Sequence, residues 1–317
     1  MDHFPFFYNE KIYLLFSGAK EKRTCYNKLV FSAGDLSRAE GTETGGKNLT
    51  LGFCSFASSS SGNCYLVKSE STNLLVDVGI SAAQISRDLK ELGIEDKEIA
   101  GVFLTHEHTD HIKSVAAYHK LAPQARFIAS AGTVNALKEK VVSQMASCFT
   151  LVKEGTDLSI GDIRVRYFRL SHDAAEPIAY TFEKDGKKIS IVTDTGCVTE
   201  EIQQAIRGSD ILVLEANHEE NILLYGKYPY PIKRRILSDK GHLSNEAAGR
   251  CLCRLLRETG GRKVPKIFLA HLSRENNTPQ QAYLTVRNLL EEEDFFLDRD
   301  FKMEVIEPAK EAKQTVI

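Results

Sequence analysis

The sequence lacks three features that would assign it to a broad class at once. Its formal net charge is only −2 over 317 residues, so any nucleic-acid binding must come from local patches. It has no apolar run near the roughly 18 residues of a membrane-spanning helix, so we expect no membrane association. Its seven cysteines form no CxxC pair, which favours reduced thiols and a cytoplasmic protein.

The first 46 residues differ in composition from the rest. Gly, Ser, Thr and charged residues dominate their second half without periodicity, which predicts a poorly structured extension over 1–46 and is consistent with a misassigned start codon. The apolar start is broken by Asn9, Glu10 and Lys11 and has no basic region before it, so we expect no signal peptide. The folded domain is predicted over 47–308, followed by a tail over 309–317.

The apolar patterns predict alternating strands and helices. Strands are expected over 49–56, 63–69, 72–79, 101–105, 125–130, 162–171, 210–217, 266–273 and 303–307, with a hairpin over 178–194 that turns at Asp185-Gly186. Helices are expected over 81–93, 112–121, 132–140, 245–258 and 279–293. This order suggests two sheets with helices outside them, in a single α/β domain.

The stretch "THEHTDH" concentrates metal-binding side chains. His106 and His108 are two residues apart, so they point the same way at a strand end, whereas on a helix they would lie about 200° apart. Asp110 and His111 follow at the start of the next helix. A zincin HExxH motif is excluded because Asp110 occupies the position of its second histidine. The plain alternative is a polar loop with surface histidines.

Three later residues strengthen the metal interpretation. His172, Asp194 and His271 each follow an apolar strand-like run, so all three can gather at one edge of the sheets. With "THEHTDH" they make five histidines and two aspartates, a mixture of N and O ligands suited to a pair of divalent ions.

The motifs HxHxDH, "SH", "TDTG" and a late His, with "LLVDVG" upstream, resemble the metallo-β-lactamase superfamily over residues 49–308. The resemblance implies a four-layer αββα sandwich with a dinuclear site at one edge. It assigns one ion to His106, His108 and His172, and the other to Asp110, His111 and His271, with Asp194 bridging. It also implies that Asp77 orients the "THEHTDH" loop by hydrogen bonds, and that Glu107 is no ligand and faces solvent.

The metal motif does not select the substrate, because two ions can activate water for a thioester, a lactam or a phosphodiester. His242 in "KGHLSNEAA" is a histidine beyond the seven ligands. It is suited to protonate a leaving alkoxide, although it is also consistent with a loop residue beside a helix start. For His218 a substrate contact and a packed side chain remain equally open.

Other segments suggest contacts with phosphate. The serine loop, with Ser59, Ser60, Ser61 and Asn63, offers hydroxyl and backbone N–H groups, or is a plain flexible hairpin. The basic segment "YGKYPYPIKRRILSDKG" interleaves tyrosines with cations, Arg234 and Arg235 among them, and suits a single-stranded nucleic acid or is a solvated loop. "HLSRENN" adds Arg274 and Asn276 as further candidate phosphate contacts.

"SFASSSSGNCYLV", "GHLSN" and "AHLSRENN" together resemble the WalJ (YycJ/VicX) group of bacterial exonucleases within that superfamily. The resemblance implies a 5′ exonuclease acting on DNA rather than RNA, with a possible repair role and two ions, Mn²⁺ or Zn²⁺. Alternatives are a glyoxalase-type thioester or small-ester hydrolase, a small-molecule or cyclic phosphodiesterase, and a non-catalytic scaffold. The oligomeric state is left open.

The expected mechanism is attack on phosphorus by a hydroxide that Asp110 and Asp194 poise, while His242 protonates the departing oxygen. His242→Ala should therefore keep its metal yet lose most turnover, whereas Asp194→Ala should lose metal. Metal content and hydrolysis rate measured on both variants check this. An intact rate in His242→Ala would remove that histidine from the mechanism.

Overall fold

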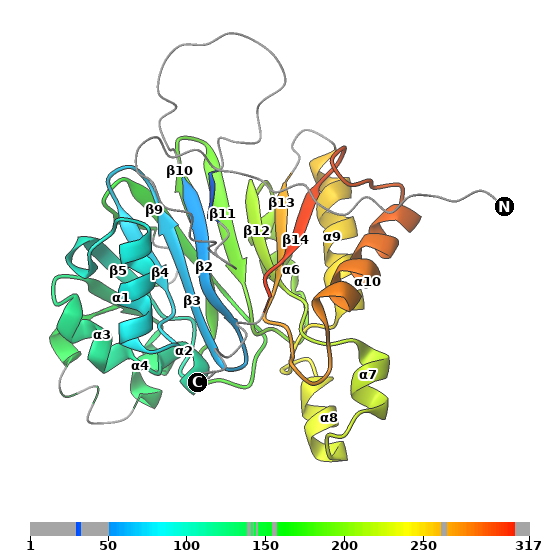
Figure 1. Cartoon of the computed structure of the whole chain (residues 1–317), viewed down its shortest axis with the longest axis horizontal. Coiled ribbons are helices and arrows are strands. Elements are labelled where there is room, and N and C mark those ends of the chain that lie inside the picture. The colour runs from blue at the N-terminus through cyan, green and yellow to red at the C-terminus, as the bar shows by residue number, and fades with distance from the viewer. Residues whose placement is uncertain are drawn as a thin grey trace, which may run out of the picture.

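The strands pair into two seven-stranded sheets that stand face to face (Figure 1). The computed structural model describes residues 30–32, 51–137, 141, 143, 145–153, 157–260 and 265–307. The first sheet contains, in order, β1 (Val30–Ser32), β2 (Gly52–Ser59), β3 (Gly62–Lys68), β4 (Asn73–Val76), β5 (Ile99–Phe103), β6 (Arg126–Ala129) and β7 (Phe149–Leu151). The second contains β14 (Lys302–Val305), β13 (Lys266–Ala270), β12 (Ile211–Glu215), β11 (Lys187–Val192), β10 (Ile178–Lys184), β9 (Ile163–Arg169) and β8 (Leu158–Ile160).

Each sheet has an antiparallel and a parallel half. Strands β1 to β4 pair antiparallel and β4 to β7 parallel, while β8 to β11 pair antiparallel and β11 to β14 parallel. The β10–β11 hairpin turns at Asp185 and Gly186, whose φ angles are 47° and 73°. Positive φ at both central residues is the geometry that favours Asp-Gly in a two-residue hairpin, so the predicted turn is confirmed.

Helices cover the outer faces of both sheets. The helices of the described residues are α1 (Ala82–Glu91), α2 (Thr109–Ile112), α3 (Val115–Leu121), α4 (Ala131–Ala136), α6 (Glu200–Ile206), α7 (Glu220–Tyr225), α8 (Tyr230–Ile236), α9 (Asn245–Thr259) and α10 (Pro279–Glu292), with 3-10 turns η2 (Asp96–Glu98) and η3 (Ala146–Cys148). Helices α1 and α3 pack on the first sheet, whereas α6, α9 and α10 pack on the second. A third core fills the space between the sheets. The predicted αββα architecture is confirmed.

Strand β5 illustrates how the sequence builds these layers. Successive side chains of a strand point to opposite faces. Val102 accordingly packs with the helices outside the first sheet, while Phe103 packs between the sheets. Because both faces are buried, the strand reads as a continuous apolar run rather than an alternating one.

The structure departs from the sequence-based elements at several points. The helix predicted over 112–121 is broken, because the N–H and hydroxyl of Ser114 both donate to Val78 O, at 3.0 and 2.9 Å. Strands β7 and β8 and helices α6, α7 and α8 were not predicted. The short strand β1 lies within the predicted extension over 1–46. The rest of that extension and the tail lie outside the described residues, so the domain limits stay a prediction.

The sequence predicted reduced cysteines and no membrane-spanning helix. The six cysteines within the described residues are all free, as expected, and four of them are buried. Among the helices of the described part of the chain, none combines the length and apolarity needed to cross a membrane.

The aromatic contacts between the sheets predict a large stability effect. The Phe103 ring lies 5.0 Å from the Tyr180 ring and 5.4 Å from the Phe182 ring, measured between centroids, and is fully buried. Phe103→Ala should lower the free energy of unfolding by about 3–5 kcal/mol through the cavity it leaves. Leu284→Ala, at a half-exposed position on α10, is the control and should change it little. Urea denaturation of both variants measures the difference, and equal midpoints would contradict it.

Candidate metal centre

The predicted metal ligands lie where strands of both sheets end. Asp77 follows β4, and the loop after β5 carries His106 and His108 into α2, which holds Asp110 and His111. From the second sheet, His172 follows β9, Asp194 follows β11 and His271 follows β13. The edge formed by these strand ends therefore collects the seven predicted ligands together with Asp77, which was expected to orient them.

The backbone is strained at three of these strand ends. Asp77, Asp194 and His271 have φ angles of 58°, 62° and 56°, in the left-handed region that non-glycine residues rarely adopt. Such a conformation costs of order 1–3 kcal/mol and persists only where neighbouring contacts enforce it. The strain turns each side chain out of its strand and toward the others.

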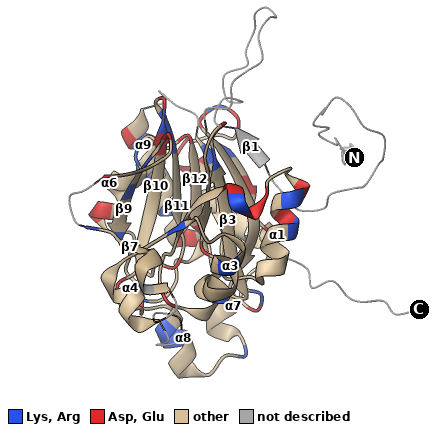
Figure 2. Cartoon of the chain, turned by 90° about the vertical axis from the view of Figure 1, so that its left-hand side faces the viewer, with Lys and Arg blue, Asp and Glu red and all other residues tan. Residues whose placement is uncertain are grey.

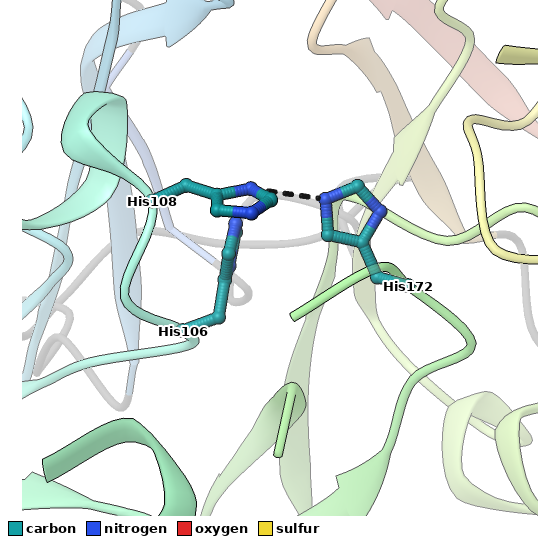
Figure 3. Close-up of side chains that lie close together, drawn as sticks. All are labelled: His106, His108 and His172. Atoms are coloured by element: carbon teal, nitrogen blue, oxygen red, sulfur yellow. Dashed lines mark hydrogen bonds between the residues drawn. The ribbon is translucent and has the colours of Figure 1, made fainter. Parts of the chain in front are cut away.

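The first cluster consists of His106, His108 and His172, whose candidate ligand atoms lie within 4.8 Å of one another (Figure 3). His172 Nδ1 lies 2.9 Å from the carbonyl oxygen of Gly241, so Nδ1 carries the proton and leaves Nε2 as a lone pair. That Nε2 lies 3.3 Å from His108 Nδ1. Burial lowers the pKa of His106 and of His172, so both rings are neutral, as metal ligation requires.

The second cluster lies beside the first and combines Asp110, His111 and His271, with Asp194 next to both clusters. His111 Nε2 lies 3.1 Å from Asp194 Oδ2 and 3.5 Å from Asp110 Oδ2. His271 Nε2 lies 3.7 Å from Asp110 Oδ2. Burial lowers the pKa of His271, but the carboxylates of Asp194, Asp110 and Glu215 outweigh that effect and raise it to about 10.

These clusters pass a test of fit for a cation. His106 Nε2, Asp194 Oδ2 and His271 Nε2 are buried and have no hydrogen-bond partner among the described residues. A buried polar atom left unpaired costs about 1–3 kcal/mol, and three of them at one edge need a common partner. Imidazole nitrogens with carboxylate oxygens are ligands for divalent transition metals. The site therefore fits divalent metal ions.

Asp77 makes the contacts that were expected of it. Its Oδ2 lies 2.7 Å from His111 Nδ1, and its Oδ1 accepts the N–H of Thr105 at 2.9 Å. The Thr105 hydroxyl donates to the same carboxylate and lies 3.0 Å from His106 Nδ1. Burial raises the pKa of Asp77, and these partners only partly offset it. Asp77 thus fixes the orientation of two rings, one in each cluster.

Helix α2 is held against the first sheet by main-chain contacts. Val78 N–H donates to His111 O at 2.9 Å. Gly79 lies so close to this helix that an added Cβ would stand 1.6 Å from Asp110 O. Only glycine permits that approach, so the position of Asp110 and His111 depends on it.

Glu215, at the end of β12, is a site residue that the sequence interpretation missed. Its Oε1 lies 2.8 Å from His242 Nδ1 and 2.9 Å from His271 Nδ1. Its Oε2 accepts the N–H groups of Thr195 and Leu243 at 2.9 and 3.2 Å. The only sequence signal was a carboxylate closing the apolar run "ILVLE".

Glu215 and His242 determine each other's charge. Burial raises the pKa of Glu215, but His242 and His271 outweigh it and lower it to about 2. Burial lowers the pKa of His242, but the Glu215 carboxylate outweighs it and raises it above its ordinary value. His242 Nδ1 also lies 3.5 Å from Asp194 Oδ1, which brings this predicted proton donor to the edge of the second cluster.

The serine loop reaches the site through one residue. Asn63 Nδ2 lies 3.0 Å from His111 Nε2 and 3.5 Å from Asp110 Oδ2, while its Oδ1 accepts the N–H of Ser59. Ser59 Oγ accepts the N–H of Ser61, closing the turn between β2 and β3. Ser60 and Ser61 are exposed at its tip.

The other predicted substrate contacts are scattered. Arg235 pairs with Asp173, whose carboxylate lies 3.4 Å from His172 Nε2, so this cation borders the first cluster. Arg234 and Arg274 are exposed. Asn276 is buried and donates to Ser273 Oγ, so the structure does not bring it to a cluster residue.

Glu107 and His218 are two further residues whose roles the sequence had raised. Glu107 is half-buried and accepts the N–H of Ala175 at 2.7 Å, so the expectation that it faces solvent was wrong. His218 is buried, with neither ring nitrogen hydrogen-bonded within the described residues, and burial lowers its pKa to about 4. A neutral, packed ring is the state that the structure gives His218.

The family described as a beta-lactamase superfamily domain matches residues 72–265. The chain belongs to the metallo-β-lactamase superfamily. The chain is 34% identical over 263 residues to "Exodeoxyribonuclease YycJ" of Bacillus anthracis, covering 83% of this chain and 98% of that one. It is 36% identical over 252 residues to "Exodeoxyribonuclease WalJ" of Streptococcus pneumoniae strain D39, covering 78% and 91%.

These relatives place the chain in the YycJ/WalJ group of the superfamily, as its motifs predicted. The solved metallo-β-lactamase fold protein YhfI of Bacillus subtilis superposes with a TM-score of 0.59 at 15% identity, over 83% of this chain and 98% of YhfI, which supports the fold alone. Membership of this superfamily and group, together with the histidine and aspartate clusters, makes the chain a metal-dependent hydrolase.

The four hydrogen bonds of Glu215 predict a strong effect of its charge. Glu215→Gln replaces one acceptor oxygen by an NH₂ group, which then faces either two ring N–H groups or two main-chain N–H groups. Metal affinity should fall about 10–100-fold, the usual cost of losing a partner that orients a ligand histidine. The metal content that remains after dialysis measures the change in affinity. Glu246→Gln, at an exposed position on α9, is the matched control. Equal retention in both variants would contradict this role.

Proposed function

We propose that the chain is a dinuclear-metal phosphodiesterase, and specifically a 5′ exonuclease that acts on DNA in preference to RNA. The observation that carries the proposal is His242, a histidine outside the seven-residue ligand set that Glu215 holds at the edge of the second cluster. Hydrolysis of a thioester does not need a proton donor in addition to the ions, because a thiol of pKa about 8.5 can leave as the thiolate. The YycJ and WalJ relatives, whose names describe exodeoxyribonucleases, support DNA as the substrate.

The residues divide into two ligand groups under this proposal. His106, His108 and His172 hold one ion, and Asp110, His111 and His271 hold the other. Asp194 lies between the groups, since its candidate ligand atoms belong with His106 and His111 as well as with His271. The ions supply an activated water and stabilise charge on the phosphoryl oxygens.

The chain itself supplies orientation and the proton. Asp110 and Asp194 direct the attacking water through their carboxylate oxygens. His242 holds one ring proton on Nδ1 against Glu215, so Nε2 is the atom that protonates the departing oxygen. The Glu215 carboxylate raises the pKa of His242, which favours the protonated ring. Arg235 pairs with Asp173 beside His172, and its positive charge next to the first cluster favours a phosphate there.

The ligand chemistry accommodates either Mn²⁺ or Zn²⁺. Five imidazoles favour zinc, because its affinity for nitrogen ligands is higher. Two carboxylates and phosphodiester chemistry suit manganese equally well. Removal and replacement of the metal therefore decides its identity: the native ion is the one that restores turnover after chelation.

One assay separates this function from its rivals. The protein with Mn²⁺ or Zn²⁺ is incubated with 5′-labelled and 3′-labelled DNA and RNA, and in parallel with a glutathione thioester. We expect mononucleotides released from the 5′ end of DNA, slower cleavage of RNA, no thioester turnover, and loss of activity in Asp194→Ala. Thioester hydrolysis without nuclease activity would contradict the proposal. Cleavage from the 3′ end would show that the proposed direction of digestion is wrong.

A further inference from the structure

Helices α7 and α8 form a protrusion at the edge of the sheets where the metal centre lies (Figure 1). This protrusion carries most of the large apolar side chains that are exposed on the described residues. Ten large apolar side chains are exposed within the described residues. Six of them belong to this protrusion, namely Ile222, Leu224, Tyr225, Tyr230, Ile232 and Leu237. Scattered apolar residues on a surface need no explanation, whereas a concentration of them marks an interaction site.

The protrusion also carries a local positive charge. Residues 220–240 contain five lysines and arginines and two acidic residues, Glu220 and Asp239, whereas the whole chain has a net charge of −2. Figure 2 shows the blue of these cations on α8, at the end of the molecule. A surface that is both apolar and cationic is complementary to a polyanion with flat apolar groups, which describes an unpaired nucleic-acid strand.

Two of the five cations have structural contacts. Lys233 Nζ donates to the carbonyl oxygens of Leu224 and Gly226, at 2.8 Å each, and so fastens α8 to the end of α7. Arg235 pairs with Asp173, next to His172 of the first cluster. These contacts make the two short helices one unit that is attached beside the metal centre.

The remaining groups are available to a ligand. Lys227, Arg234 and Lys240 are exposed, and their side chains form no ion pair with the described part of the chain. Tyr225 ends α7 and is 89% exposed, and Tyr230 begins α8 and is 75% exposed. Only four residues separate the two rings in sequence, so both lie at the junction of the helices.

We propose that this protrusion binds a single-stranded nucleic acid, with Tyr225 and Tyr230 stacking on unpaired bases and Lys227, Arg234 and Lys240 contacting phosphates. The inference rests on the proposed function, because the strand that the protrusion binds is the strand that the metal centre cleaves. The bases that stack on these rings are unpaired, as in a strand end that has separated from its partner. Stacking on a tyrosine face tolerates any base, so the contact carries no sequence preference.

Binding can be measured apart from cleavage. A fluorescent single-stranded oligodeoxynucleotide with phosphorothioate linkages resists hydrolysis, and its anisotropy reports its affinity for the metal-loaded protein. Tyr225→Ala and Tyr230→Ala should each weaken binding about tenfold, the scale of one missing base–aromatic stack. Tyr225→Phe and Tyr230→Phe keep the ring and should bind like the parent chain. Leu284→Ala, exposed on α10, is the control for removal of apolar surface elsewhere.

The contribution of the cations can be measured separately, through the salt dependence of binding. Lys227→Ala, Arg234→Ala and Lys240→Ala should each reduce the dependence of log affinity on log salt concentration by about 0.7 for every phosphate that the variant no longer binds. The tyrosine variants should leave that slope unchanged, because stacking releases no counterions.

Hydrolysis of bis-p-nitrophenyl phosphate, a diester too small to reach the protrusion, distinguishes the two proposals. Its turnover should be the same in the parent chain, in the two tyrosine-to-phenylalanine variants and in Leu284→Ala. A parent chain that cleaves neither this diester nor DNA defeats the proposed function, while the anisotropy still decides the inference. Unchanged affinity in both alanine variants overturns the inference. So does a parent dimer that Tyr225→Ala converts to monomer, because the surface is then an interface between copies of the chain.

Discussion

The buried carboxylate of Glu215 is the interaction on which the arrangement of the site depends. It lies at the end of a strand in the second sheet, and its two oxygens accept four hydrogen bonds, from His242, His271, Thr195 and Leu243. These partners come from three separate segments of the chain. A buried charge is tolerated only when it is paired and fully hydrogen-bonded, so folding must bring all three segments to this one side chain.

Asp77 has the corresponding place in the first sheet, where it joins His111 to the loop that carries His106. The two carboxylates hold Nδ1 of His111 and of His271, and the Nε2 atoms of both rings face Asp110 Oδ2. The clusters are therefore oriented by groups behind them, and the unpaired atoms in front are those left for a cation. The left-handed backbone of Asp77, Asp194 and His271 is the strain that this arrangement stores.

The αββα fold and the clustering of the seven residues were predictable, because each of the four segments that carry them comes after an apolar strand-like run. Glu215 was not, because one glutamate at a strand end has no spacing that marks it, and its importance arises from partners 27 and 56 residues away. Helices α7 and α8 escaped prediction because they are only 6 and 7 residues long, too short for a helical period to show in the sequence. The helix breaks at Ser114 because this residue hydrogen-bonds to Val78, which is distant in the sequence. Local helix propensity cannot predict such a contact.

Both clusters draw on both sheets. His106 and His108 meet His172, and Asp110 and His111 meet His271, across the interface between the two halves of the chain. Neither half alone contains a complete set of ligands. A chain that ends before residue 271 therefore lacks one member of the second cluster. The site is complete only when the end of β13 lies beside α2, so the two sheets and the clusters form together.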